Sequence, residues 1–336
     1  MTPLAKLIST AAICACLSGC AAPGVSVRML EPGSSNEAAR LRTVAVLPFG
    51  GLDGGDFSAE VEALLGGIRL NGQQYFQIVS RRDLDQVLDE FKLSSSGMLG
   101  PDTLRAGALM GAQGIYTGQV TNHGVTDSRY FEEKEECSTK NPKGKCTSWV
   151  KVHIPCIRRT ASFDLALRLV ETQSSRVVFS ELYREQIEDK ACRDDLNPIA
   201  NSSSLTRKMK DNILEKIRRD VAPYYRTETV KLIDDTEGLP PPQEKTFESA
   251  LEFASSDRLD RACSLWKQIE DQKTETVPLL HNLAVCSEAQ GDMERALHLI
   301  NRADSLLSKP DKRVGEALAR IRGGVSKQAK ARQQMP

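Results

Sequence analysis

The side chains of this chain that are best suited to chemistry are its nine cysteines. A thiol can be acylated, oxidised to a disulfide or used as a metal ligand, so the position of each cysteine decides its use. Cys14 and Cys16 lie in an apolar stretch from Leu7 to Leu17, and Cys20 follows this stretch closely. The other cysteines all lie beyond position 136, which separates them from the N-terminal set.

Cys20 closes an N-terminal segment with the layout of an export signal. Lys6 gives the segment a positive start, and the apolar stretch that follows has the ~7–15 residues of a signal peptide, not the ~20 of a membrane-spanning helix. Leu17-Ser18-Gly19-Cys20 resembles a bacterial lipobox, in which the cysteine is acylated and the chain is cut just before it. Its small residues let the peptide lie extended for processing. The alternative is an ordinary secretory signal with a chance cysteine.

We therefore expect a signal peptide over residues 1–19 and a covalent lipid on Cys20 as the membrane anchor, with no other cofactor. Residue 21 is Ala and not Asp. By resemblance to sorted lipoproteins of Gram-negative bacteria, this favours attachment to the periplasmic face of the outer membrane.

The cysteines of the exported part indicate disulfides, because their number is even and the compartment is oxidising. They are Cys137, Cys146, Cys156, Cys192, Cys263 and Cys286. Sequence alone does not settle their pairing, but proximity favours 137 with 146, 156 with 192 and 263 with 286. The alternative is a metal site. We expect none, because no C-x-x-C pair occurs and the chain has only four histidines.

The charge balance argues against binding to nucleic acid. Lys and Arg number 45, as do Asp and Glu, whereas a nucleic-acid-binding domain normally shows a strong basic excess. The 336 residues are enough for two domains of ordinary size.

The apolar pattern predicts an α+β domain with a mixed sheet and helices packed on it, over residues 41–226. A buried strand over 43–49 comes first, and a long strand from 150 to 170 pairs with a return strand over 177–187 through a turn at 172–175. The polar segment 124–148 forms a hairpin extension whose turn lies between Cys137 and Cys146. Helices are expected over 57–68, 81–93, from 101 and over 204–225.

The remaining segments have a different composition. We expect a tether over 20–40, a Pro-containing linker over 227–245, helical repeats over 246–310 and a basic, disordered tail over 311–336. The run from Leu279 to Leu297 resembles a tetratricopeptide repeat, with Gly291 at the turn and Ala296 at the helix contact. A weaker copy covers 250–269. These repeats would offer a groove to a partner segment.

No motif supports an enzyme. G-x-S-x-G is absent, and the glycines of segment 50–55 follow neither the dinucleotide pattern nor the Walker pattern. This glycine-rich segment is more simply a turn, and Asp53 and Asp56 in it would repel phosphate. His123 and His153 could meet across the hairpin, although isolated histidines are usually structural.

Residues 42–225 resemble the CsgG-like lipoprotein domain, the family of the curli secretion channel. The matching segments are VAVLPF at 44–49, FQIVSRRDL at 76–84, GAQGIYTG at 111–118 and LALRLVET at 165–172. Members of this family either form oligomeric outer-membrane rings that export protein or polysaccharide, or regulate cell-wall synthases.

The chain departs from the pore-forming pattern of that family. A pore-forming member would insert hairpins with alternating apolar residues after residue 118 and after residue 187. Here the first place holds Glu132-Glu133-Lys134-Glu135-Glu136, and the second is charged from Asp189 to Asp195. Such charges oppose burial in lipid.

The resemblance therefore implies a lipid-anchored scaffold or adaptor of the envelope that binds protein partners and has no pore of its own. The alternatives are a subunit of an oligomeric secretion ring, and a regulator of a peptidoglycan synthase. A homo-oligomer is compatible with each of these roles.

Overall fold

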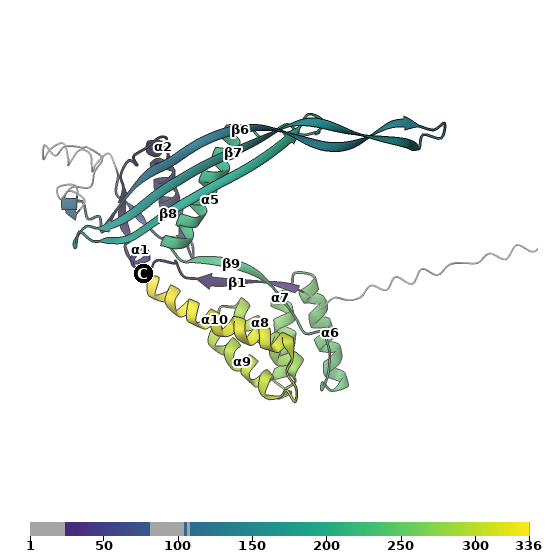
Figure 1. Ribbon diagram of the computed structural model, residues 1–336. Helices are drawn as coiled ribbons and strands as arrows, with labels where there is room; N and C mark the ends of the chain where they lie inside the picture. The colour runs from purple at the N-terminus through teal and green to yellow at the C-terminus, as the bar shows by residue number, and fades with distance from the viewer. Residues whose placement is uncertain (1–23, 81–103, 106–107, 336) are drawn as a thin grey trace, which may run out of the picture. The chain divides into compact units, whose positions relative to one another are not determined.

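The computed structural model describes residues 24–80, 104–105 and 108–335, and it has the expected α+β class. The chain divides into two compact units (Figure 1). The sheet unit contains the described residues from 30 to 225 and 327–335, and the helical unit contains 24–29 and 226–326. The predicted signal peptide, Cys20 and the helices expected over 81–93 and from 101 lie outside the described residues, apart from fragments at 104–105 and 108–109.

A five-stranded mixed sheet organises the sheet unit. In spatial order its strands are β5 (Gln77–Ile78), β2 (Thr43–Val46), β6 (Gly114–Lys140), β7 (Cys146–Glu171) and β8 (Val177–Cys192). β2 runs parallel to β5 and β6, whereas β6, β7 and β8 are antiparallel neighbours. A separate short hairpin joins β3 (Arg69–Leu70) to β4 (Gln73–Gln74).

Helices α2 (Gly54–Gly67) and α5 (Ser202–Val221) cover one face of this sheet (Figure 1). The alternation expected for β7 is confirmed, because its buried residues come at every second position and enter one core with the apolar stripe of α5. These residues are Phe163, Leu165, Leu167 and Leu169 from β7 and Leu205, Met209, Ile213 and Ile217 from α5. A buried face this continuous fixes the register of the long strands.

The helical unit is built from consecutive helices joined by short turns. They are α6 (Pro241–Ser255), α7 (Leu259–Glu270), α8 (Val277–Ala289), α9 (Met293–Ser305) and the part of α10 (Lys312–Gln334) up to residue 326. Gly291 takes a φ of +78° at the turn between α8 and α9, and Ala296 is fully buried, as a close helix contact requires. The helical character expected for this region is therefore present, while its tetratricopeptide class stays a prediction.

Three segments that were expected to lack regular structure are ordered. The prediction of a tether over 20–40 is wrong for residues 24–40, which form β1 (Gly24–Glu31) and the short helix α1 (Asn36–Arg40). β1 pairs with β9 (Tyr224–Lys231), which occupies the start of the expected linker. The alternating Val25, Val27 and Met29 of β1 are buried in the core of the helical unit.

The disordered tail expected over 311–336 is also wrong, because α10 extends from Lys312 to Gln334. Val314, Ala317 and Ile321 are fully buried and recur at helical spacing. The basic, glutamine-rich composition of the segment conceals this short apolar stripe.

The core of the helical unit includes a small polar cluster around Asn282. Its side chain accepts a hydrogen bond from the Ile233 backbone N–H at 2.9 Å and donates one to the Ile233 carbonyl at 2.8 Å. His281 Nδ1 lies 3.2 Å from the Asn282 Oδ1 atom. His281 is only 2% exposed, and its burial lowers the pKa of the imidazole from 6.5 to about 4.

This pKa shift predicts that acid destabilises the folded chain through His281. Between pH 6.5 and about 4 the unfolded chain binds a proton that the folded chain does not, so the free energy of unfolding falls as the pH falls, by up to about 3 kcal/mol. Urea titrations across this pH range should show the fall in the native chain. His281→Gln should remove that part of it, and equal pH profiles for the two proteins would contradict the prediction.

Candidate interaction surface: a disulfide-linked β-ribbon

A two-stranded ribbon at the far end of β6 and β7 is an exposed regular feature of the sheet unit. These strands pair from Gly114 opposite Glu171 to Lys140 opposite Cys146, whereas β8 accompanies β7 only as far as Cys192 opposite Cys156. Residues 131–140 and 146–155, with the turn between them, therefore continue beyond β8; we call this part the ribbon (Figure 1). At 3.3 Å per residue, the ten residues that each strand contributes give it a length of roughly 30 Å.

Disulfides hold the ribbon at both ends. Cys156 bonds to Cys192 at its base, and Cys137 bonds to Cys146 next to the turn. A hairpin of two strands is marginally stable by itself in water. Both covalent links therefore restrict opening of the ribbon. The third disulfide, Cys263–Cys286, joins α7 to α8 in the helical unit.

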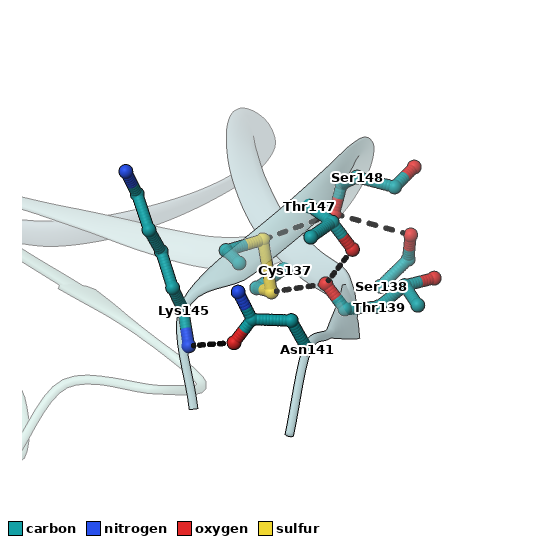
Figure 2. The surroundings of a disulfide bond; sticks show 8 residues. Cys137, Ser138, Thr139, Asn141, Lys145, Thr147 and Ser148 are labelled. Atoms are coloured by element: carbon teal, nitrogen blue, oxygen red, sulfur yellow. Dashed lines mark hydrogen bonds between the residues drawn. A yellow bond between two sulfur atoms is a disulfide. The ribbon is translucent and has the colours of Figure 1, made fainter. Parts of the chain in front are cut away.

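The turn at the tip is fixed by local hydrogen bonds as well as by its disulfide (Figure 2). The Asn141 side-chain oxygen accepts from the backbone N–H groups of Lys143 and Lys145 at 3.0 and 2.9 Å. The Thr147 hydroxyl donates to the Thr139 carbonyl at 3.0 Å, across the two strands. Asparagine is suited to this role because its short amide can cap its own turn. The tip is thus a defined structure.

Charged pairs lie on both faces of the ribbon, between its base and its turn. Glu133 lies opposite His153 and contacts Lys151 at 3.2 Å, and on the other face Lys134 reaches Asp194 at 2.7 Å. The hydrogen bond from Lys134 lowers the pKa of the Asp194 carboxyl. Phe131 and Trp149 stand out among these polar residues, at 68% and 60% exposure. A long, exposed ribbon with charges on both faces is suited to contact with another surface and offers no enclosed site for chemistry.

The two histidines considered together in the sequence are not brought together. His123 lies opposite Phe163 and His153 lies opposite Glu133, at distant points of the same strand pair. A metal site is equally unsupported at the base of the ribbon. Ligand atoms of Glu132, Cys156 and Cys192 lie within 4.8 Å of one another, but the two sulfurs are bonded to each other and are no longer thiolates.

The glycine-rich loop at residues 50–55 is a structural turn. A Cβ on Gly51 would lie 2.1 Å from the Val120 carbonyl oxygen, and one on Gly54 would lie 2.6 Å from that of Phe49. Asp53 forms an ion pair with Lys210 of α5, whose ammonium also contacts Glu60 at 3.2 Å. Burial lowers the pKa of Lys210, but the hydrogen bonds to both carboxylates outweigh this and leave the pKa raised. These contacts join the loop to α5.

Sequence reasoning missed a polar cleft of about 590 Å³ between β8 and α5. In it the Tyr183 hydroxyl donates to Asp220 at 2.8 Å, and Lys216 pairs with Glu185. Burial and the hydrogen bond to Asp220 both raise the pKa of Tyr183. The only available signal was the periodicity of α5, which shows its buried face but not the strand residues that its polar face meets.

The family comparison decides the class of the sheet unit. Residues 54–192, which include α2, the long strands and the ribbon, match the family model of the curli production assembly/transport component CsgG. The chain carries a CsgG-like domain. The predicted resemblance is therefore confirmed for this part of the chain. Residues 248–332 match a second family model, a domain of unknown function, DUF6340.

Several solved structures are similar to part of the chain. The LpoB C-terminal domain from Salmonella enterica is 11% identical, covers 43% of this chain and 82% of its own, and has a TM-score of 0.26. Lipoprotein GNA1162 from Neisseria meningitidis is 10% identical, with coverage of 52% and 97% and a TM-score of 0.28. The PelC dodecamer from Paraburkholderia phytofirmans is 14% identical, with coverage of 57% and 96% and a TM-score of 0.24.

No curated protein matches the chain. Among the residues that the structure describes, no helix is both long enough and apolar enough to cross a membrane.

Proposed function

We propose that this protein is a lipid-anchored lipoprotein of the bacterial outer membrane that faces the periplasm and acts as a scaffold or adaptor in envelope assembly or export, without a pore of its own. The CsgG-like domain over 54–192 supports a role in the envelope. The lipobox-like sequence ending at Cys20 supports anchoring by lipid. The proposed adaptor is not an enzyme; its partners are other envelope proteins.

The observation that carries the proposal is the charge on both faces of the ribbon. Successive residues of a strand point to opposite faces, so the charged run Glu132-Glu133-Lys134-Glu135-Glu136 places carboxylates on each face. A hairpin that lines a pore in lipid needs one apolar face, and a lysine at the bilayer midplane costs about 2–4 kcal/mol. The ribbon thus has no face suited to the acyl chains.

The end of β8 and the loop after it have the same character. Asp189 and Lys190 lie in the last residues of β8, and Arg193, Asp194 and Asp195 follow it. Asp194 is also held by Lys134 across the base of the ribbon. The second place where a pore-forming relative would insert a hairpin is therefore engaged in polar contacts within this chain.

Conductance measurements test the absence of a pore. The acylated protein, purified in mild detergent and added to a planar lipid bilayer, is expected to give no stable current steps over the detergent control, because neither face of the ribbon can line a pore in lipid. A characterised pore-forming protein prepared in the same detergent serves as the positive control. Stable unitary channels from this protein would overturn the proposal.

Native mass spectrometry of the same preparation, extracted gently from its own membrane, tests the adaptor role. A monomer, or a defined complex with another envelope protein, supports the adaptor, and the helical unit is the part we propose to hold the partner segment. A closed ring of many copies would instead identify a secretion-ring subunit. A co-purifying peptidoglycan synthase would identify a regulator of that enzyme.

A further inference from the structure

The tip of the ribbon carries an excess of positive charge. Residues 137–151 contain four lysines and no aspartate or glutamate, whereas the whole chain has a formal net charge of zero. Lys151 is paired with Glu133. Lys140, Lys143 and Lys145 are exposed, and no ion pair with them occurs within the described parts of the chain. The tip therefore presents a local cluster of positive charge to solvent.

This cluster is held in place by the molecule. The Cys137–Cys146 disulfide and the Asn141 hydrogen bonds fix the turn that carries the lysines (Figure 2). A preorganised cluster loses less conformational freedom on binding than a flexible basic tail does. The disulfide thus keeps the three charges together at the end of the ribbon, which is roughly 30 Å long.

Exposed apolar side chains adjoin the lysines. Trp149 is 60% exposed and Val150 is 45% exposed, on neighbouring positions of β7. Trp149 lies opposite Cys137, so it sits beside the disulfide of the tip. Lysine side chains are attracted to anionic headgroups, and tryptophan is enriched at the boundary between headgroups and acyl chains. The combination fits a membrane interface better than it fits a soluble polyanion, which would leave the indole in water.

We propose that the ribbon tip docks on the surface of an anionic phospholipid bilayer. Lys140, Lys143 and Lys145 contact lipid phosphates, and Trp149 enters the interfacial region. The acidic run Glu132–Glu136 begins directly beside the tip, because Glu136 and Val150 form the residue pair next to Cys137 and Trp149. These carboxylates limit the contact to the headgroup level. The proposal goes beyond the adaptor role, because it gives the ribbon a second membrane contact in addition to a lipid on Cys20.

Vesicle binding by the mature chain carrying Cys20→Ser tests this without the contribution of an anchor. Binding is expected to vesicles of phosphatidylcholine with phosphatidylglycerol, to weaken at high salt, and to be absent with phosphatidylcholine alone. The chain has two tryptophans and Trp266 is fully buried, so a blue shift in emission reports Trp149 at the membrane.

The combined variant Lys140→Gln, Lys143→Gln and Lys145→Gln should bind at least about ten-fold more weakly, since each lysine near an anionic surface raises the partition coefficient roughly five-fold. The matched control removes three lysines that are exposed in the helical unit, by Lys245→Gln, Lys267→Gln and Lys309→Gln, and should bind as the unaltered chain does.

Three results of the binding measurements would overturn the proposal. They are no binding to the anionic vesicles, equal weakening by the tip variant and the control variant, and binding to a soluble polyanion such as dextran sulfate in place of vesicles. The blue shift of Trp149 emission is measured on the unaltered chain, so this readout does not depend on any variant. Binding without leakage of a trapped dye would support docking at headgroup level, and leakage would overturn it.

Discussion

Replacing Arg320 with methionine is expected to lower the free energy of unfolding of the helical unit by about 3–5 kcal/mol, because it leaves a buried carboxylate without its partner. Glu288 has a fully buried side chain. Arg320 Nε lies 3.0 Å from one of its oxygens and Nη2 lies 2.7 Å from the other, so the pair is bidentate. Urea unfolding followed by the fluorescence of the buried Trp266 would measure the loss.

The pH dependence identifies the cause of this loss. Burial raises the pKa of the Glu288 carboxyl, and Arg320 counteracts that rise. Without Arg320 the pKa rises further above the unfolded value of 4.5. A buried carboxyl with a raised pKa is tolerated in its protonated form. The free energy of unfolding of the variant should therefore be lowered least at pH values below the unfolded pKa of Glu288. The loss should grow as the pH rises through the folded pKa.

Two companion variants separate this effect from a general loss of packing on α10. Arg322→Met alters an exposed arginine of the same helix and should change the stability by less than about 1 kcal/mol. The double change Glu288→Gln with Arg320→Met removes the buried charge and should recover part of the loss. A deficit for Arg320→Met no larger than that for Arg322→Met would contradict the proposed role of the pair.

The long strands of the sheet unit could be predicted from the sequence because their signal is local. Phe163, Leu165 and Leu167 alternate with small or polar residues, and Thr172 and Ser175 bound the following turn. Period-two alternation reports burial on one face of a strand without knowledge of its partner. The hairpin extension was predictable from its polar composition and from the turn residues between Cys137 and Cys146. Its continuation beyond β8 was not, because it depends on where a neighbouring strand ends.

The segments assigned by composition were the ones predicted wrongly. Gly33 belongs to the expected tether and Gln334 to the expected tail, yet the two bond to each other. The Gln334 side chain accepts from the Gly33 N–H at 2.8 Å and donates to its carbonyl at 2.9 Å, and Gln334 is only 2% exposed. Each segment looks flexible by itself, since its order comes from a partner about 300 positions away. Composition within a window cannot report such a contact.

The pairing of charges within the sheet unit lay beyond sequence reasoning in the same way. Lys134 meets Asp194 and Lys210 meets Asp53, across 60 and well over 100 positions of the chain. The sequence shows only that these residues are charged, and it favours a solvated surface for each of them. The internal ion pairs must be known before one can say which charges remain free for a partner. The lysines of the tip are such charges.

Replacing Cys156 and Cys192 together with alanine is expected to lower the free energy of unfolding by about 4 kcal/mol. The two cysteines are 36 positions apart, and the entropy of closing a loop of this length in the unfolded chain gives a stabilisation of that size. Urea unfolding followed by circular dichroism would measure the loss. Hydrogen exchange should locate it, with faster exchange at the last residues of β8 and at the base of the ribbon.

The tip disulfide provides the matched comparison. Cys137 and Cys146 close a shorter loop, of 9 positions, so their replacement by alanine should cost less, about 2–3 kcal/mol, and should speed exchange only near the turn. The order of the two losses follows from loop length, and the two exchange patterns follow from the positions of the bonds. A loss for the tip pair equal to that for the base pair would show that these bonds stabilise the ribbon through local packing and not through restriction of the unfolded chain.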